Sequence, residues 1–219
     1  MAKGNRGGKG GSGGGDEGTG AIKRDKGAKV GEILSSTSMI SMRESKRSEV
    51  DEALGVLRDV GDKYKTSVSE AFVTKIKGGS AVAFYASNFD TVSINSSFFD
   101  SKKMNSAYDE MVKIGYHPSR GNKTGMEATV AHELGHKLTA DAMEKLGAKN
   151  FDEASNMIVK EARKSTSHRG VVQMSNAISR YATASNSEAI AEAFSDVYCN
   201  GAKAKQESHA IVNTLEKYL

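Results

Sequence analysis

Apolar residues at helical spacing define the first regular element of this 219-residue chain. Val50, Leu54 and Leu57 recur three or four positions apart, which places them on one face of a helix. Ser48 precedes them as a residue type that caps first turns, and the pattern ends near Tyr64. We therefore predict an amphipathic helix between these two positions.

Three short apolar stretches follow, and their lengths and composition are typical of strands. We expect them over residues 71–76, 81–85 and 91–95. A Gly-Gly pair ends the first stretch, and residues 87–90 supply turn-forming types between the second and the third. The second and third stretches therefore predict a β-hairpin.

The rest of the chain carries apolar residues mainly at helical spacing. Thr124 and Glu127 stand three apart, as in a capping box, so a helix should begin at about Gly125. The other expected elements are helices over 105–114, 151–164, 171–181, 188–199 and 202–218 and an irregular loop over 115–121. This order predicts an α+β domain in which a small, mostly antiparallel sheet is followed by a helical C-terminal half.

Composition divides the chain at residue 31. Residues 1–31 hold 12 of the 23 glycines, with seven Lys or Arg against three Asp or Glu, a net charge of +4. The whole chain has the same formal charge, so residues 32–219 are neutral overall and lack the basic bias of a nucleic-acid surface. We expect residues 1–31 to be a disordered tail capable of only weak contact with nucleic acid, and residues 32–219 to form the domain.

Cysteine content and hydropathy bear on the compartment. Cys199 is the only cysteine, which excludes a disulfide framework and a multi-cysteine metal site. The N-terminal residues lack the apolar core of a secretory signal, and no apolar run approaches membrane-spanning length. We therefore expect a cytoplasmic protein without membrane contact.

The segment His132-Glu133-Leu134-Gly135-His136 carries the strongest chemical signal in the chain. Two histidines at i and i+4 lie on one face of a helix, so their rings can bind a single Zn²⁺. Glu133 is the carboxylate next to the first of them, placed to act as general base on a metal-activated water. Gly135 costs a helix interior about 1 kcal/mol relative to Ala, a cost that makes sense if another element packs closely there.

A catalytic zinc site takes a third protein ligand and keeps one position for water. Thr139 and Ala142 occupy the positions at which metzincins carry a glycine and a third histidine, which excludes that class. Glu188 and Glu192 lie one turn apart on an Ala-rich helix, where unpaired carboxylates are costly. Taken alone, Glu188 is better explained as an N-terminal helix carboxylate paired with Ser185. Together with the first motif, it is expected to bind the metal, while Glu192 bonds to a ligand histidine.

The two motifs together resemble the zinc peptidase domain of anthrax lethal factor and its relatives, which are gluzincins with Glu as third ligand. Tyr181, Glu188 and the triplet that begins at Glu192 stand in the register of that family's second motif. The resemblance implies a zincin-like fold and roles for six residues: zinc ligands His132, His136 and Glu188, general base Glu133, oxyanion donor Tyr181 and orienting carboxylate Glu192.

A second resemblance is to small bacteriophage-encoded domains assigned as metallopeptidases, and it rests on residues 94–98 and 115–118. It implies a location in the host cytoplasm or the phage particle, and a virion or host protein as partner. We predict a zinc-dependent peptidase that acts on a protein or peptide substrate. The alternative is a zinc-stabilised structural or head-associated phage protein without catalytic turnover.

Two further residues are left with open roles. His117 could reach the site, but its place before Pro118 in a Gly-containing loop favours a role in holding the loop. Asp196 lies four residues after Glu192 and either extends the second shell of hydrogen bonds around the metal or caps a surface pair.

Overall fold

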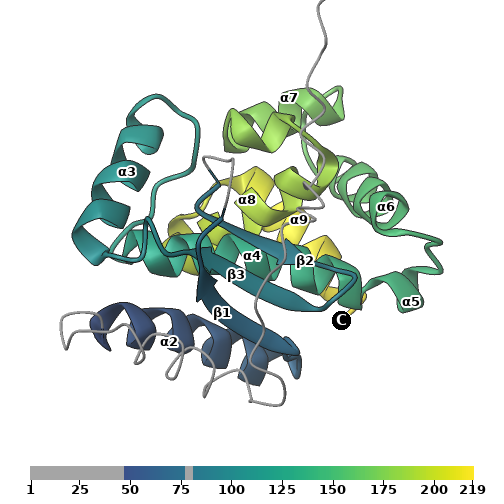
Figure 1. The fold of residues 1–219 in the computed structure, drawn as a ribbon. Coiled ribbons are helices and arrows are strands. Elements are labelled where there is room, and N and C mark those ends of the chain that lie inside the picture. Colours follow the sequence, from purple (N-terminus) through teal and green to yellow (C-terminus); the bar gives the residue numbers. More distant parts are fainter. Residues whose placement is uncertain (1–46, 77–80) are drawn as a thin grey trace, which may run out of the picture.

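The computed structural model describes residues 47–76 and 81–219, which form eight α-helices, two 3₁₀ turns and one three-stranded sheet (Figure 1). In chain order the elements are α2 (Arg47–Tyr64), β1 (Glu70–Thr74), β2 (Ala83–Ala86), β3 (Thr91–Asn95), α3 (Ser101–Lys113), α4 (Gly125–Asp141), α5 (Met143–Leu146), α6 (Phe151–Arg163), α7 (Val171–Ile178), η2 (Tyr181–Thr183), α8 (Asn186–Asn200), η3 (Gly201–Lys203) and α9 (Gln206–Glu216). The predicted tail over residues 1–31, and the predicted domain up to residue 46, lie outside the described residues. The predicted α+β class is confirmed.

The sheet has the strand order β1-β3-β2 and is mixed. β3 pairs with β2 in antiparallel fashion, which confirms the predicted hairpin, and with β1 in parallel, from Glu70 opposite Thr91 to Thr74 opposite Asn95. The prediction of a mostly antiparallel sheet is therefore wrong. After β1 the chain skips the adjacent position in the sheet and forms β2 one position farther away. β3 then fills the position between β1 and β2 and runs parallel to β1. All five residues of β3 are buried, as a central strand requires.

Asp90 holds the hairpin turn and ties it to the helices. Its backbone has φ +51°, a conformation that Asp tolerates better than most residues. Its carboxylate accepts hydrogen bonds from the backbone N–H and hydroxyl of Ser69 and from the Tyr85 hydroxyl, all at 2.9 Å. Lys137 Nζ of α4 lies 3.2 Å from the same carboxylate. The edge strand β2 is thereby fixed relative to the helix that carries the first motif.

The start of α4 is set by the predicted capping box. Thr124 Oγ1 accepts from the Glu127 N–H at 3.2 Å, and the Glu127 carboxylate accepts from the Thr124 N–H at 2.7 Å. The residues expected on the inner face, Val130, Leu134 and Leu138, are buried. Gly135 lies against Ala191 of α8, so the predicted close packing is confirmed.

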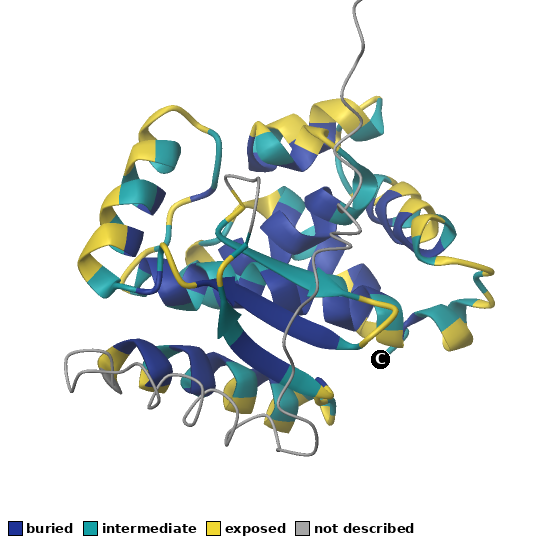
Figure 2. Cartoon of the chain, viewed as in Figure 1, coloured by how far each residue is buried: buried dark blue, intermediate teal, exposed yellow. Residues whose placement is uncertain are grey.

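The core is centred on α4, α8 and the inner face of the sheet. In Figure 2, the central helices and β3 are largely buried, whereas α3, α6 and α7 expose their outer faces. Every residue of α8 from 188 to 196 is buried, including three carboxylates. Val50 and Leu54 of the predicted first helix are buried as well, while Leu57 is only partly covered. Such burial means that the polar groups of α8 need partners within the fold.

Two C-terminal helices differ in length from the prediction. α7 ends at Ile178, because Ser179 takes an extended conformation that turns the chain toward α8. The last helix begins at Gln206 and not at residue 202, because the 3₁₀ turn η3 is followed by extended backbone at Ala204 and Lys205. Gly147 ends α5 with φ +66°, the left-handed conformation expected of a glycine at that position.

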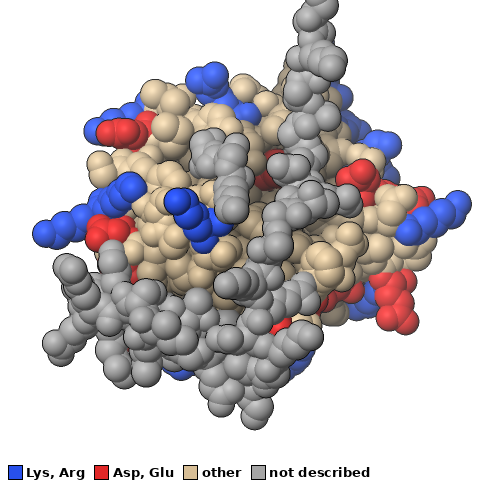
Figure 3. Space-filling view, viewed as in Figure 1, with Lys and Arg blue, Asp and Glu red and all other residues tan. Residues whose placement is uncertain are grey.

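Charges on the visible face are mixed. Figure 3 shows Lys and Arg interspersed with Asp and Glu around the rim of this face, with no single large patch of one sign outside the grey atoms. Within the described part of the chain, no helix is both long enough and apolar enough to cross a bilayer.

Candidate metal centre

His132, His136 and Glu188 converge on one point between α4 and α8. The two histidines lie one turn apart on α4, and Glu188 lies in the first turn of α8, where Ser185 caps the helix by accepting from the Glu188 N–H at 3.1 Å. Each of the three offers a ligand atom, and these atoms lie within 4.8 Å of one another. Glu188 takes part in both arrangements. Its backbone N–H caps the helix through Ser185, while its carboxylate faces the two histidines.

The spacing of the donor atoms fits a tetrahedral ion. Glu188 Oε2 lies 3.1 Å from His132 Nε2 and 3.6 Å from His136 Nε2. At zinc bond lengths of about 2.0–2.2 Å, a tetrahedral site separates its ligand atoms by about 3.3–3.5 Å. Glu188 Oε2 is also buried and forms no hydrogen bond within the described residues. A buried carboxylate oxygen of this kind is costly unless a cation or donor satisfies it, so the three residues fit a metal ion.

The two histidines and Glu188 influence one another strongly. Burial would raise the pKa of Glu188, but the nearby His132 and His136 rings hold it well below its usual range. Burial would likewise lower the pKa of His132, but Glu188 and Glu192 together hold it well above its ordinary value. The site is therefore built to hold positive charge.

Glu192 forms hydrogen bonds with side chains from three different segments, one of which is the candidate ligand His132. Its Oε1 lies 2.9 Å from His132 Nδ1 and 2.9 Å from His117 Nδ1, and its Oε2 accepts from the Ser179 hydroxyl at 2.8 Å. Burial alone would raise the pKa of Glu192, but the two histidines lower it to about 2. The carboxylate is thus charged and acts as an acceptor for both rings. An acceptor at His132 Nδ1 leaves Nε2 as the ring atom that can bind a metal.

Glu133 lies on the same helix with its side chain near the donor atoms. Glu133 is buried, with 5% of its surface exposed. Burial raises the pKa of its carboxyl, and the charges of His132 and His136 act to lower it. The backbone of Tyr85, on the edge strand β2, lies near this carboxylate and also acts to lower its pKa. A carboxyl with a raised pKa, held between a sheet edge and two histidines, is suited to accept and return a proton.

Tyr181 forms a wall of the site. Its ring stacks on His132 with centroids 5.9 Å apart and on Tyr116 at 5.0 Å. Burial, and then the Glu188 carboxylate, raise the pKa of its phenol well above the ordinary value, so the hydroxyl keeps its proton. The ring position allows this hydroxyl to act as a hydrogen-bond donor near the metal ligands.

Asp196 lies away from the centre, so a place in the second shell, one of the two roles left open for it from sequence, is wrong. Its Oδ1 accepts from Asn200 at 2.8 Å, and its Oδ2 accepts from the backbone N–H of Lys205 at 3.0 Å and from the Ser208 hydroxyl at 2.6 Å. The reason is helical geometry: four residues beyond Glu192, the side chain lies a full turn farther from His132 and reaches the start of α9 instead. Asp196 therefore joins α8 to α9.

Sequence reasoning assigned no site role to Ser179 or Tyr116, and it favoured a loop role for His117 while leaving open that this residue reaches the site. Ser179 lies in no motif and follows a helix that was predicted to continue past it. The Gly-Tyr-His-Pro loop was the available signal, since it brings Tyr116 and His117 to the site together.

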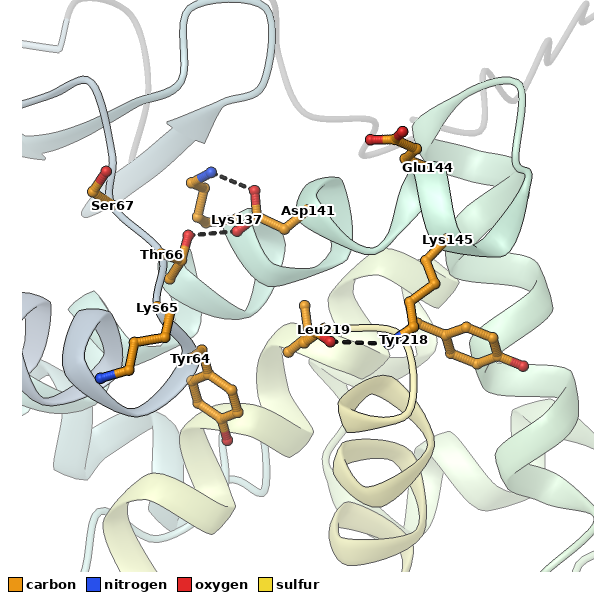
Figure 4. A pocket seen from close by; sticks show the side chains of 10 residues that line it. All are labelled: Tyr64, Lys65, Thr66, Ser67, Lys137, Asp141, Glu144, Lys145, Tyr218 and Leu219. Carbon is orange, nitrogen blue, oxygen red and sulfur yellow. Dashed lines mark hydrogen bonds and ion pairs between the residues drawn. The ribbon is translucent and has the colours of Figure 1, made fainter.

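The larger of two pockets in the described part of the chain does not coincide with the candidate metal ligands. It holds about 730 Å³ between the end of α2, the end of α4 and the C-terminus (Figure 4). Lys137 and Asp141 of α4 line it and pair with each other at 2.5 Å, but none of His132, His136 and Glu188 does. A smaller, mainly apolar pocket of about 210 Å³ lies between α2 and α4. The three candidate metal ligands therefore line neither of these two pockets.

Comparison with known proteins returns no match: no protein-family model, no curated protein and no solved structure matches the chain. The geometry of the site and its two motifs therefore carry the functional interpretation.

Proposed function

We propose that this protein is a zinc-dependent peptidase with a zincin-like domain of the gluzincin type. The supporting observation is the convergence of His132, His136 and Glu188, whose ligand atoms lie within 4.8 Å of one another around the helix that also carries Glu133. When bound, zinc lowers the pKa of a water molecule toward about 7 and polarises the scissile carbonyl. Three protein ligands, two imidazoles and a carboxylate, match the donor set of a catalytic rather than a fully closed structural zinc site.

The remaining steps fall to residues of the chain. Glu133 accepts a proton from the attacking water and delivers it to the leaving amine nitrogen, a task that its raised pKa favours. The Tyr181 hydroxyl donates a hydrogen bond to the oxygen of the scissile carbonyl as negative charge develops there. Glu192 keeps His132 in the ring orientation that presents Nε2.

The substrate is proposed to bind along β2. In the described sheet, β3 is central and paired on both sides, whereas β2 has β3 alone as partner. An extended peptide can add to such an edge through main-chain hydrogen bonds. The influence of the Tyr85 backbone on the pKa of Glu133 supports this proposal, because it requires the β2 edge to lie near the proposed base.

The test combines metal analysis with cleavage of a mixed peptide library by purified protein. Glu133→Gln should keep stoichiometric zinc and lose hydrolysis, because the amide cannot accept the proton. His132→Ala should lose both. Retention of stoichiometric zinc by Glu188→Ala would refute the third-ligand assignment.

A zinc-stabilised structural protein is the second candidate, and the position of the ligands favours it. They come from α4 and α8, the two most buried helices, so an ion bound there would cross-link the core. In that case zinc removal lowers the melting temperature, while the wild-type protein cleaves no peptide in the library and Glu133→Gln matches the wild type in every assay.

A further inference from the structure

His117 contacts the candidate metal centre through Glu192, although 75 residues separate the two in the sequence. Its Nδ1 lies 2.9 Å from Glu192 Oε1, the oxygen that is also 2.9 Å from His132 Nδ1. An ionised carboxylate only accepts hydrogen bonds, so both rings carry hydrogen on Nδ1 in this arrangement. Two imidazoles thus share one acceptor atom, and only one of them belongs to the metal ligands.

Aromatic contacts fix the orientation of the His117 ring. Tyr108, itself buried, stacks on it with centroids 5.2 Å apart and an interplanar angle of 14°. Tyr116 and Tyr181 meet the ring edge to face at 5.0 and 5.6 Å. Tilting of the ring plane would break these contacts, and a half-turn within the plane would put Cδ2 in place of Nδ1 and lose the bond to Glu192, so the contacts and the bond together hold the ring.

The loop that carries His117 is also bonded to the segment that carries Tyr181. The Arg180 N–H donates to Gly115 O at 2.9 Å, and the Tyr181 N–H donates to Tyr116 O at 3.1 Å. Ser179, in the same segment, donates to the other oxygen of Glu192 at 2.8 Å. Both segments and α4 therefore meet at one carboxylate.

We propose that His117 is a positioning residue for the metal centre: it holds Glu192 in place, and through it the His132 ring and the Tyr181 segment. This role rests on the proposed zinc site of the protein. It differs from simple loop attachment in one chemical requirement, because it needs a hydrogen-bond donor at the Nδ1 position and at no other point of the ring.

Two substitutions separate these roles. In His117→Asn, the amide nitrogen falls close to the position of Nδ1, whereas in His117→Gln it falls close to that of Nε2. Loss of a partner around a metal-ligating histidine commonly costs about 10–100-fold in metal affinity, so we expect a loss in that range for Gln and less than about threefold for Asn. The measurements are the zinc dissociation constant, by competition with a chromophoric chelator, and the visible spectrum of the Co²⁺-loaded proteins, which reports the ligand geometry.

The outcomes keep this role apart from the peptidase proposal. Equal zinc affinity and equal Co²⁺ spectra in the wild type and in the Asn and Gln variants would overturn the role of His117. The peptidase proposal would then still stand. Zinc binding with the expected difference between variants, but no cleavage by the wild type, would support the role and refute the peptidase. Absence of zinc binding by the wild type would overturn both.

A measurement on the unaltered chain covers the case in which His117→Gln does not fold. Nitrogen-15 NMR of the histidine rings in the wild-type protein reports which nitrogen carries hydrogen. A protonated Nδ1 on His117 is expected, and an unprotonated Nδ1 would overturn the proposal because that atom could not then donate to Glu192.

Discussion

Gly135 of α4 lies directly against the backbone of Ala191 in α8. A Cβ atom at position 135 would come within 2.7 Å of Ala191 Cα and 3.1 Å of Phe194 Cβ, closer than packed side chains allow. This contact sets the separation of the two helices that carry the candidate metal ligands. The helix-breaking tendency of glycine is therefore offset by the close approach that places Glu188 opposite His132 and His136.

Gly135→Ala should destabilise the protein and weaken zinc binding together. Alanine gains about 1 kcal/mol of helix propensity, but overpacking of a tight contact costs about 1–3 kcal/mol, so a net loss is expected. The added methyl group would also push α4 and α8 apart, which would increase the distance between Glu188 and the two histidines and weaken zinc binding. Denaturant unfolding of the metal-free protein and zinc titration of the folded protein measure the two effects.

Gly55→Ala is the matched control, because Gly55 lies in α2 and a Cβ there would meet no atom within 4 Å. It should stabilise the protein by about 0.5–1 kcal/mol and leave zinc affinity unchanged. A Gly135→Ala variant as stable as Gly55→Ala, with wild-type zinc affinity, would contradict the proposed role of the helix contact.

Glu192→Gln and Asp196→Asn should act on different properties, although both replace a buried carboxylate of α8. The first weakens an acceptor of His132 Nδ1, so zinc affinity should fall about 10–100-fold. The second disturbs three hydrogen bonds to Asn200, Lys205 and Ser208, which should cost about 1–3 kcal/mol of stability without a change in zinc affinity. Zinc competition and denaturant unfolding on both variants provide the comparison, and a zinc defect in Asp196→Asn would return Asp196 to the metal site.

The parts of the site that local sequence could predict are those that depend on one helix. The start of α4 follows from Thr124 and Glu127 three positions apart, and the direction of His132 and His136 follows from their spacing of four. The approach of Glu188 to the histidines required the pairing of α4 with α8, which Gly135 indicated without naming the partner. Here sequence and structure agree because short-range geometry determines the result.

The parts that sequence could not predict depend on contacts between distant segments. The His117 contact with Glu192 joins residues 75 positions apart, and no periodicity marks either partner for the other. The strand pattern likewise gave the presence of β1 and β3 but not their parallel pairing, since apolar alternation specifies a buried face and not a neighbour. Asp196 shows the converse error, because spacing along one helix suggested a contact that the rise of the helix prevents.

Zinc affinity should increase with pH around neutrality, and zinc binding should release protons. In the metal-free protein, burial would lower the pKa of His132, but Glu188 and Glu192 raise it well above its ordinary value of 6.5. The stability that this histidine contributes to the metal-free fold is present below pH 6.5 and is lost as the pH rises through its raised pKa. Zinc must displace that proton from Nε2, so a less acidic solution favours binding.

Calorimetric titration of zinc in two buffers of different ionisation enthalpy measures the released protons. A difference corresponding to about one proton per zinc is expected at pH 7. Identical heats in the two buffers, or an affinity that falls between pH 6 and pH 8, would contradict a protonated His132 in the metal-free protein.

Tyr181→Phe should slow peptide cleavage while leaving the metal and the fold in place. The stacking contacts of this ring with His132 and Tyr116 remain, because phenylalanine keeps the aromatic face. Only the hydroxyl is lost, and removal of one donor to a developing oxyanion typically lowers kcat about 10²–10³-fold. KM should change little, because the bond strengthens as charge develops and contributes less to binding of the ground state.

Tyr116→Phe is the control for this change, because Tyr116 stacks on Tyr181, whereas the ring of Tyr181 is the one that stacks on His132. It should retain kcat to within a few-fold, with unchanged zinc content. A KM increase at constant kcat in Tyr181→Phe would assign the hydroxyl to substrate binding, and equal kcat losses in both variants would assign the effect to the packing of the stack. A selective kcat loss in Tyr181→Phe would place the hydroxyl at the reacting carbonyl.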